Sequence, residues 1–528
     1  MNPKSILILS LFTISSIFTT PHAQMTMAAD EEEGFRPIFN GKDLDGWDGN
    51  PGFWSVQDGA LTGQTTKEKP TRGNTFIIWR QGELDDFELR LDYKIVGGNS
   101  GIQYRSFENP KWGKWVVGGY QADFEAGNTY SGILYGERFR GILAQRGQST
   151  EIGDNHRPKV LEKVGNSAEL QANIKKEDWN SYRIIARGHQ FTHEINGKVT
   201  CKVLDNDMKM RRRSGILALQ LHAGPPMTVQ FRNIRLKRLK LGDKKKIVMV
   251  SGHRSHGYGS HEFNAGHLLM KELLDKSSAA VHTTVYLNQG HLKPAVPVMN
   301  GNWPKDPTAF DNADSVVLFM NGGGGHPVNR HLDEIDALMK KGVGLACLHY
   351  GVEVPKGKPG DSFLDWIGGY FEAHWSVNPH WIIKDVTLAK DHPITEGVKP
   401  FTSNDEWYFH MRFRDKMEGV TPILSAVAPK ETMKRRDGAH SGNPAVRASV
   451  ARGDLQHVAW ARQRPDGGRG FGFTGLHYHK NFADDDFRKL VLNAMVWVAG
   501  AEVPKGGVDT PKPTEDELKL HQDYGKRK

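Results

Sequence analysis

Alternating hydrophobic and polar positions dominate the first half of the chain. Residues 35–238 follow the two-residue period of half-buried strands, most clearly at Phe87, Leu89, Leu91, Tyr93 and Ile95. The dipeptide Asn196-Gly197 favours a tight hairpin between two such segments. The closing strand, 228–239, has a phase slip that indicates a bulge. This half therefore predicts a β-sandwich.

From Ile247 onward, short apolar strands alternate with amphipathic helices, which is typical of an α/β domain with a mostly parallel sheet. The predicted strands, each followed by a polar loop, are 247–250, 315–320, 343–348 and 471–476. The last predicted helix has one apolar face, formed by Phe487, Leu490, Val491, Ala494 and Val498.

The length and composition fit two soluble globular domains. The chain has 528 residues, of which 38% are hydrophobic and 25% charged. We expect a β-sandwich at 34–238, a basic linker at 239–246, an α/β domain at 247–500 and a flexible tail at 501–528. The net charge of +9 lies in short runs, which we interpret as solvated loops and the linker, so we expect no nucleic-acid binding. The sequence predicts no particular oligomeric state.

The first 29 residues have the order of a secretory signal peptide. Lys4 precedes an apolar stretch at 6–18, and Pro21, His22 and Ala23 follow it. We expect a periplasmic or secreted protein with no stable membrane insertion after cleavage, although an uncleaved anchor is an alternative. The two cysteines, Cys201 and Cys347, fall in different predicted domains, so we expect no disulfide between them.

Histidines are concentrated in the second half of the chain. Of 23 histidines, 17 lie between residues 247 and 500, and several directly follow predicted strands. Because the carboxyl ends of parallel strands meet at one edge of a sheet, we expect these side chains to share a crevice. His253, His256, His261 and His479 are candidate ligands of a divalent metal ion, and Glu262, Glu353 and Glu406 are nearby carboxylates. The alternatives are an acid/base site, or histidines that only hydrogen-bond the loops.

The second half also carries the segments SGHRSHGYGSHEFNAG, MNGGGGHP, GLACLHYG, DEWYFHMRF and GFGFTGLHYHKNF. With these segments it resembles the ThuA-like (trehalose utilisation) family, which implies the three-layer α/β fold of class I glutamine amidotransferases. In that fold a catalytic cysteine occupies a sharp turn after a strand. Here the turn position falls on His349, and Cys347 lies two residues earlier, on the buried strand. The late histidine and acid of the amidotransferases fall on His477 and His479. We therefore expect an inert Cys347 and no glutaminase activity. His349, Glu353, Glu406 and His477 remain candidate residues for binding a sugar.

The first half contains FNGKDLDGW, NSGIQYRS, GGYQADFE, YSGILYGE, DWNSYRIIARG and LQLHAGPPMTVQFRNIRLK. These segments resemble the 3-keto-disaccharide hydrolase family, which implies a concanavalin-like jelly roll. The resemblance also implies cleavage of a 3-keto-glycoside: the ketone acidifies the proton on C2, a base removes it, the group on C1 departs, and water adds later.

Such a reaction needs a base, an acid and a group that stabilises the enolate. Asp123 and Glu125 are candidates for proton transfer because residues two apart in a strand share a face. Arg105 is a candidate enolate stabiliser and His222 a further proton carrier or cation ligand. Gln121, Tyr120 and Gln220 are candidate substrate contacts, although Tyr120 could equally be a core aromatic and Asp123 a solvated charge or an ion-pair partner of Arg105.

Three hypotheses remain open at this stage. The first is an exported enzyme that cleaves 3-keto-glycosides with its sandwich and binds or processes a related small carbohydrate in the second domain. The second treats the sandwich as a sugar-binding module without catalysis. The third assigns the activity to the second domain through a bound divalent metal ion.

Overall fold

The computed structural model describes residues 33–288, 298–299 and 303–525. The predicted signal peptide, residues 1–29, lies outside this described part. Among the described residues, every helix is too short or too polar to span a bilayer.

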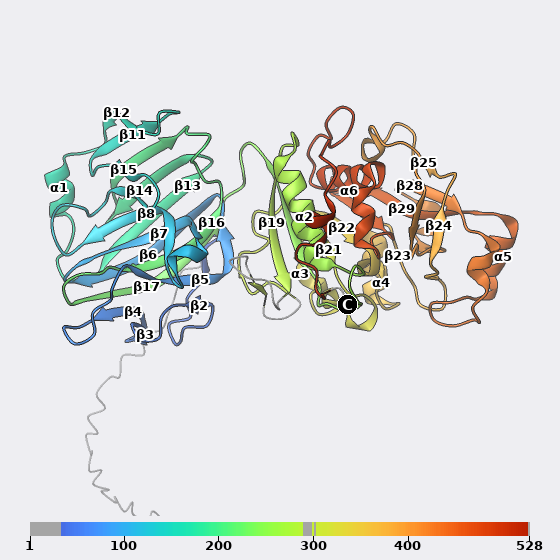
Figure 1. Ribbon diagram of the computed structural model, residues 1–528, viewed down its shortest axis with the longest axis horizontal. Helices are drawn as coiled ribbons and strands as arrows, with labels where there is room; N and C mark the ends of the chain where they lie inside the picture. Colours follow the sequence, from blue (N-terminus) through green and yellow to red (C-terminus); the bar gives the residue numbers. More distant parts are fainter. Residues whose placement is uncertain (1–32, 289–297, 300–302, 526–528) are drawn as a thin grey trace, which may run out of the picture. The chain divides into compact units, whose positions relative to one another are not determined.

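Two β-sheets form the first half of the described chain (Figure 1). The strand order of the first sheet is β12 (Pro158–Lys163), β11 (Gln148–Ile152), β15 (Lys198–Asp205), β14 (Gln190–Ile195), β13 (Asn180–Arg187), β6 (Phe87–Val96), β17 (Met227–Arg238), β4 (Ala60–Thr65) and β3 (Trp54–Gln57), with β1 (Arg36–Pro37) beside β17. The strand order of the second sheet is β10 (Gly141–Ala144), β9 (Leu134–Glu137), β8 (Val117–Glu125), β7 (Asn99–Glu108), β16 (Gly215–Leu221), β5 (Thr75–Leu84) and β2 (Trp47–Asp48). A short helix, α1 (Ser167–Ala172), lies between β12 and β13 in the chain.

The two sheets share one hydrophobic core, which confirms the predicted β-sandwich. The apolar residues of β6 alternate into this core as predicted, and the rings of Tyr93 on β6 and Phe124 on β8 lie 4.0 Å apart. The hairpin at Asn196-Gly197 joins β14 to β15, and both of its residues have positive φ, as a tight turn requires. The predicted bulge in β17 is present as a shift of register between Arg232 and Arg235.

The second half contains a mixed sheet with helices. Its order is β20 (Val298–Met299), β19 (Val281–Asn288), β18 (Lys245–Ser251), β21 (Ser315–Phe319), β22 (Gly344–Leu348), β30 (Arg469–Phe473), β29 (Leu455–Gln463), β28 (Val420–Val427) and β25 (Thr387–Leu388). Neighbours from β20 to β30 run parallel, whereas β29, β28 and β25 are antiparallel additions. The parallel part is the region in which strands alternating with helices were predicted.

Successive residues of β18 enter two different cores, because side chains of a strand alternate between the faces of its sheet. Met249 packs in the core that contains residues of α2 (Phe263–Lys276) and α6 (Asp485–Val498). Val250 packs in the core that contains residues of α3 (Leu332–Met339) and α4 (Lys358–Trp366). The remaining helices of the described chain are α5 (Pro444–Arg452) and α7 (Glu515–Lys519), and two short ribbons pair β23 (Gly369–Tyr370) with β27 (Arg412–Phe413) and β24 (Trp381–Ile383) with β26 (Ser403–Asp405).

The tail after residue 501, expected to be flexible, makes specific contacts where the structure describes it. The Asp523 backbone N–H donates to Glu262 Oε2 at 2.7 Å, and Asn264 Nδ2 donates to Asp523 Oδ1 at 3.0 Å. The polar composition of this segment suggested disorder because it gives little apolar area to bury, but here hydrogen bonds to the start of α2 hold it.

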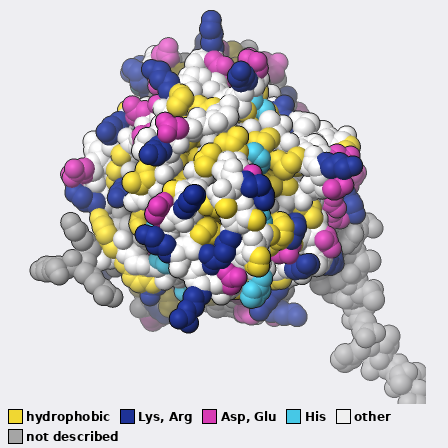
Figure 2. Space-filling view, turned by 90° about the vertical axis from the view of Figure 1, so that its right-hand side faces the viewer, with side chains coloured by type: hydrophobic (Ala, Val, Ile, Leu, Met, Phe, Trp, Pro, Cys, Tyr) yellow, Lys and Arg dark blue, Asp and Glu magenta, His cyan; other side chains and the backbone are white. Residues whose placement is uncertain are grey.

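On the face drawn in Figure 2, cationic side chains are interspersed with anionic ones.

Candidate functional site

The second sheet of the sandwich has one apolar and one polar face. On β8, Tyr120, Ala122 and Phe124 point into the core, so Gln121 and Asp123 point to the opposite face. Gln103 of β7 donates to Gln121 Oε1 at 2.5 Å, and Gln121 Nε2 in turn donates to Asp123 Oδ2 at 2.9 Å. Gln121, predicted as a substrate contact, and Asp123 are therefore joined in one hydrogen-bonded polar network.

Asp123 is the buried carboxylate of this polar face. Its side chain accepts hydrogen bonds from Asn99 Nδ2 at 2.8 Å and from Gln121. Burial raises the pKa of Asp123 to about 7, although both amide hydrogen bonds act in the opposite direction and the negative charges of Glu125 and Glu137 add to the rise. A carboxyl group with a pKa near neutrality can both accept and release a proton during a reaction.

Gln220 and Glu137 extend the network. Gln121 Nε2 approaches Gln220 Oε1 at 3.5 Å. Glu137, on β9, accepts from Asn74 Nδ2 at 3.4 Å; burial raises its pKa, while the hydrogen bond from Asn74 and the charges of Arg138 and His222 act to lower it. Gln220 also acts on Glu137 as a hydrogen-bond donor, so this face is a buried network of amide and carboxylate side chains.

Sequence reasoning missed Glu137, although the residue ends the quoted segment YSGILYGE. The alternation of side chains between the two faces of β9 could have identified it. In this strand Tyr135 lies opposite Gln121, and Glu137 lies opposite Gly119.

Two of the candidate site residues in the sandwich are buried inside the domain and do not belong to the polar face. Arg105 is fully buried and forms an ion pair with Asp86 at 2.8 Å. The other nitrogens of its guanidinium group donate to backbone carbonyls. The register shift between Tyr104 and Phe107 explains this, because the bulge turns Arg105 away from the polar face. Tyr120 lies in the core, and its hydroxyl group donates to Asp205. Neither residue is positioned to contact a ligand on the polar face.

The two remaining candidates differ in their surroundings. Glu125 Oε1 accepts from the backbone N–H groups of Thr129 and Tyr130 at 2.6 and 2.9 Å, so its side chain holds the following loop. His222, directly after β16, is half-buried and lies beside Glu137, which keeps it a candidate proton carrier.

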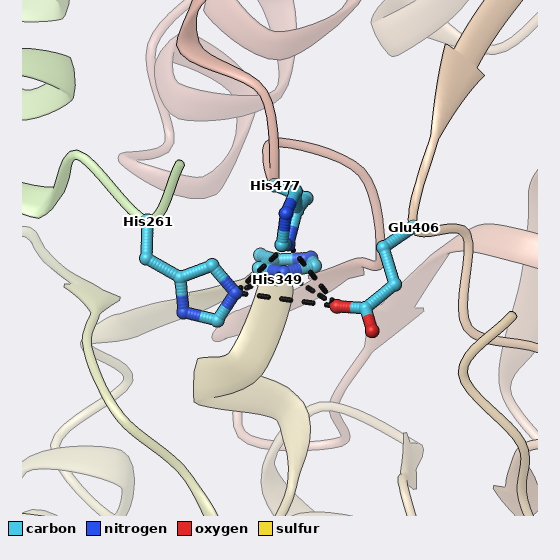
Figure 3. A group of neighbouring side chains, drawn as sticks. All are labelled: His261, His349, Glu406 and His477. Carbon is cyan, nitrogen blue, oxygen red and sulfur yellow. Dashed lines mark hydrogen bonds and ion pairs between the residues drawn. The ribbon is translucent and has the colours of Figure 1, made fainter. Parts of the chain in front are cut away.

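A second cluster lies at the carboxyl ends of the parallel strands in the other domain. Figure 3 shows His261, His349, Glu406 and His477 pointing toward one centre. His261 comes from the loop after β18, His349 directly follows β22, and His477 follows β30. One ligand atom from each of the four residues lies within 4.8 Å of the others. The predicted convergence of histidines at this edge is therefore present.

The contacts within the cluster are short. His261 Nε2 lies 3.0 Å from both His349 Nε2 and His477 Nδ1. Glu406 Oε2 lies 3.1 Å from His477 Nδ1, 3.6 Å from His349 Nε2 and 4.0 Å from His261 Nε2. Burial lowers the pKa of His261, and the neighbouring His349 adds to this. Burial alone would raise the pKa of Glu406, but its hydrogen bonds with His349 and His477 hold it well below its usual value.

The surrounding residues orient the cluster. His349 Nδ1 donates to the backbone carbonyl of Thr474 at 2.8 Å, which leaves its Nε2 as the inward-facing atom. The buried Asp405 accepts from the backbone N–H of His477 at 2.9 Å. His261 and His349 have positive φ, of 52° and 48°. Such backbone strain in non-glycine residues is concentrated at functional sites.

The structure brings only one of the predicted metal ligands into this cluster. Of the four histidines proposed, His261 alone belongs to the cluster. His253 is exposed, with Nδ1 2.7 Å from the carbonyl of Arg254, and His479 packs against Phe482. His256 stacks on His261 at 3.6 Å between ring centroids but lies outside the four-residue group. Spacing within one loop could not reveal that the other ligand positions come from distant segments.

His349, Glu406 and His477, expected to bind a sugar, are the other members of this group. Glu353 lies nearby, but its Oε1 pairs with His440 Nε2 at 2.9 Å. Cys347 is fully buried in an apolar core, as predicted from its place on the strand, and burial raises its pKa. Both Cys201 and Cys347 are free, as expected.

Comparison with known proteins identifies the class of both domains. Residues 34–237 match the family model described as a 3-keto-alpha-glucoside-1,2-lyase-like domain, and residues 301–498 match the model described as trehalose utilisation, ThuA. The two resemblances seen in the sequence are thereby confirmed, and the chain combines two carbohydrate-related domains. No curated protein matches the chain.

Solved structures of carbohydrate-related proteins also align with part of the chain. One, from Parabacteroides distasonis and provisionally described as a glycosyl hydrolase, is 20% identical over 39% of this chain and 99% of its own, with a TM-score of 0.26. The carbohydrate-binding module CBM66 of Bacillus subtilis is 16% identical over 36% and 95%, with a TM-score of 0.25. The β-glucanase of Bacillus licheniformis is 11% identical over 39% and 97%, with a TM-score of 0.25.

Proposed function

We propose that the β-sandwich cleaves 3-keto-glycosides by elimination and hydration, with Asp123 as the base. The observation that carries the proposal is the place of Asp123: a buried carboxylate with a pKa of about 7, within a network of amide side chains on a polar sheet face. The match of this domain to a glucoside-1,2-lyase-like family supports the same chemistry.

In the proposed reaction, Asp123 removes the proton from C2, whose acidity comes from the ketone at C3. The C–H electron pair forms the C1–C2 double bond as the C1–O bond breaks, and the departing oxygen takes a proton from Glu137 or His222. Water then adds across the double bond, with its hydroxyl group on C1 and a proton on C2. Gln121 and Gln220 offer amide groups to the sugar hydroxyls.

The test compares an aryl 3-keto-glucoside with its unoxidised parent, using the full chain and following release of the aryl alcohol. We expect release from the ketone only, and loss of that release in Asp123→Asn. Asp58→Asn is the matched control, since Asp58 lies in an exposed turn between β3 and β4. Binding of the sugar without release, weakened by Asp123→Asn but not by Asp58→Asn, would show that the sandwich is a binding module and would overturn the proposal.

We also propose that the second domain, with an amidotransferase-like three-layer fold, holds a divalent metal ion between His261, His349, Glu406 and His477. The convergence of three imidazoles and one carboxylate supports this role, because these are the preferred ligands of zinc and similar ions. Metal analysis of the purified full chain tests it: one ion per chain is expected, and none after addition of each candidate metal would contradict it.

We further propose export to the periplasm or the medium, which the signal-peptide pattern of the first 29 residues supports, and a small carbohydrate as the substrate, which the matches of both domains support.

A further inference from the structure

Three imidazole nitrogens and one carboxylate oxygen face a common centre in this cluster. His261 Nε2 approaches two ring nitrogens at 3.0 Å, but one nitrogen carries at most one proton. His349 donates from Nδ1 to Thr474, so in its neutral form its Nε2 has a lone pair and no proton. This lone pair can accept the proton of His261 Nε2 or bind a metal ion at the centre.

The distances match those of a metal centre. A tetrahedron with bonds of about 2.0–2.2 Å to nitrogen and oxygen has edges of roughly 3.3–3.6 Å. Five of the six edges between His261, His349, His477 and Glu406 range from 3.0 to 4.0 Å, which brackets the tetrahedral value, and the sixth is at most 4.8 Å. The hydrogen bond from His349 to a backbone carbonyl is also the usual support of a metal-bound imidazole. Three nitrogens and one oxygen favour zinc, cobalt or nickel over calcium and magnesium.

Tyr408 places a hydroxyl group beside the same centre. Its oxygen lies 3.3 Å from His349 Nε2 and 3.4 Å from Glu406 Oε2, and its ring is buried between Phe371 and the His349 ring. An ion held by these four donors would take a ligand oxygen by expanding to five-coordination, and an oxygen beside His349 and Glu406 would be within reach of this hydroxyl. A metal ion and a phenol that address one oxygen together polarise a carbonyl group.

The surroundings of the cluster suit a polyhydroxylated ligand. His256 and His380 are exposed, and their rings lie 5.6 and 4.9 Å from that of His477. The Tyr478 hydroxyl lies 3.3 Å from His380 Nδ1. The solvent side of the cluster thus presents several hydrogen-bonding groups.

We propose that this centre is a Lewis-acid site of the zinc type that binds a keto sugar through its carbonyl oxygen, with Tyr408 donating a hydrogen bond to that oxygen. The inference rests on the metal site proposed above and adds the ligand class and the role of Tyr408. The same ligand class would be formed by the sandwich, so the two domains would handle one family of sugars.

Cobalt spectroscopy of the full chain tests this, because the visible bands of bound Co²⁺ report only on the metal centre and not on the sandwich. The probes are 3-keto-glucose and glucose. We expect 3-keto-glucose to shift the cobalt bands in a saturable way, glucose to have no effect at the same concentration, and Tyr408→Phe to bind 3-keto-glucose at least tenfold more weakly. Tyr130→Phe, in an exposed position of the sandwich, is the matched control.

The outcomes separate the two proposals. Failure of the chain to bind cobalt or zinc would overturn the metal site itself. A normal cobalt spectrum that 3-keto-glucose leaves unchanged, or equal affinity in Tyr408→Phe with cobalt still bound, would overturn the ligand class or the role of Tyr408 while leaving the metal site intact.

Discussion

The Nε2 atoms of His261 and His349 lie 3.0 Å apart, although the two residues are 88 positions apart in the chain. They meet because the loops after β18 and β22 leave the sheet at the same edge. The backbone strain at both residues shows that the fold holds them in this arrangement against local preference.

Removing the negative charge of the cluster should weaken metal binding. Glu406→Gln keeps the size of the side chain but replaces the carboxylate, which is the one anionic ligand among the four residues. We expect the affinity for Zn²⁺ to fall at least tenfold, measured by competition with a chromophoric chelator. Glu353→Gln serves as the comparison, since Glu353 pairs with His440 and is outside the group; equal losses in the two variants would contradict the assignment.

The activity of the sandwich should rise with pH. Asp123 acts as a base only when ionised, and its pKa is about 7. We expect the rate of aryl alcohol release from a 3-keto-glucoside to increase from pH 5 to 8 with a midpoint near 7, and Asp123→Asn to lower the rate by about 10²–10⁴-fold. A rate that falls over this pH range would indicate that Asp123 works in its protonated form.

Asp123 should also make stability depend on pH. Its pKa is raised in the folded protein from about 3.9 in an unfolded chain, so its contribution is fully present below about pH 4 and is lost as pH rises to about 7. The loss amounts to at most about 4 kcal/mol. Urea unfolding of the wild type and of Asp123→Asn should show a difference in unfolding free energy that changes in this direction. A difference independent of pH would contradict the raised pKa.

Arg105 should matter for stability and not for chemistry. Replacing it with methionine leaves the buried carboxylate of Asp86 without its partner, which typically costs about 3–5 kcal/mol. We expect a large fall in the urea midpoint of the sandwich. The activity per folded molecule should remain close to that of the wild type; a selective loss of activity in a stably folded variant would return Arg105 to the catalytic candidates.

The contacts of the tail predict a role in holding the loop that carries His261. Glu262 directly follows His261, and its carboxylate accepts hydrogen bonds from the backbone N–H groups of both Gly259 and Asp523. Deleting residues 520–528 should therefore increase the rate at which bound zinc is released to a chelator, while the sandwich keeps its activity. Unchanged zinc release would show that the loop holds its shape without the tail.

Local sequence patterns predicted the strands and several site residues because those depend on short-range periodicity. The alternation in β8 placed Gln121 and Asp123 on one face, and the strand ends placed His349 and His477 at one edge of the sheet. Glu406 was singled out as a nearby carboxylate, but no pattern could select it over Glu262 and Glu353, because it follows a short strand, β26, outside the parallel sheet. The burial of Arg105 depends on a bulge and on Asp86 in another strand, which no local pattern shows.

The most direct test of the proposed sandwich chemistry is the fate of the C2 hydrogen. A 3-keto-glucoside is cleaved by the full chain in D₂O, and the sugar product is analysed at early times, with 3-keto-glucose incubated without enzyme as the control for spontaneous exchange. Elimination followed by hydration predicts one deuterium at C2 in each product molecule. A product that keeps its original C2 hydrogen would show direct displacement at C1 and would contradict the role of Asp123 as the base.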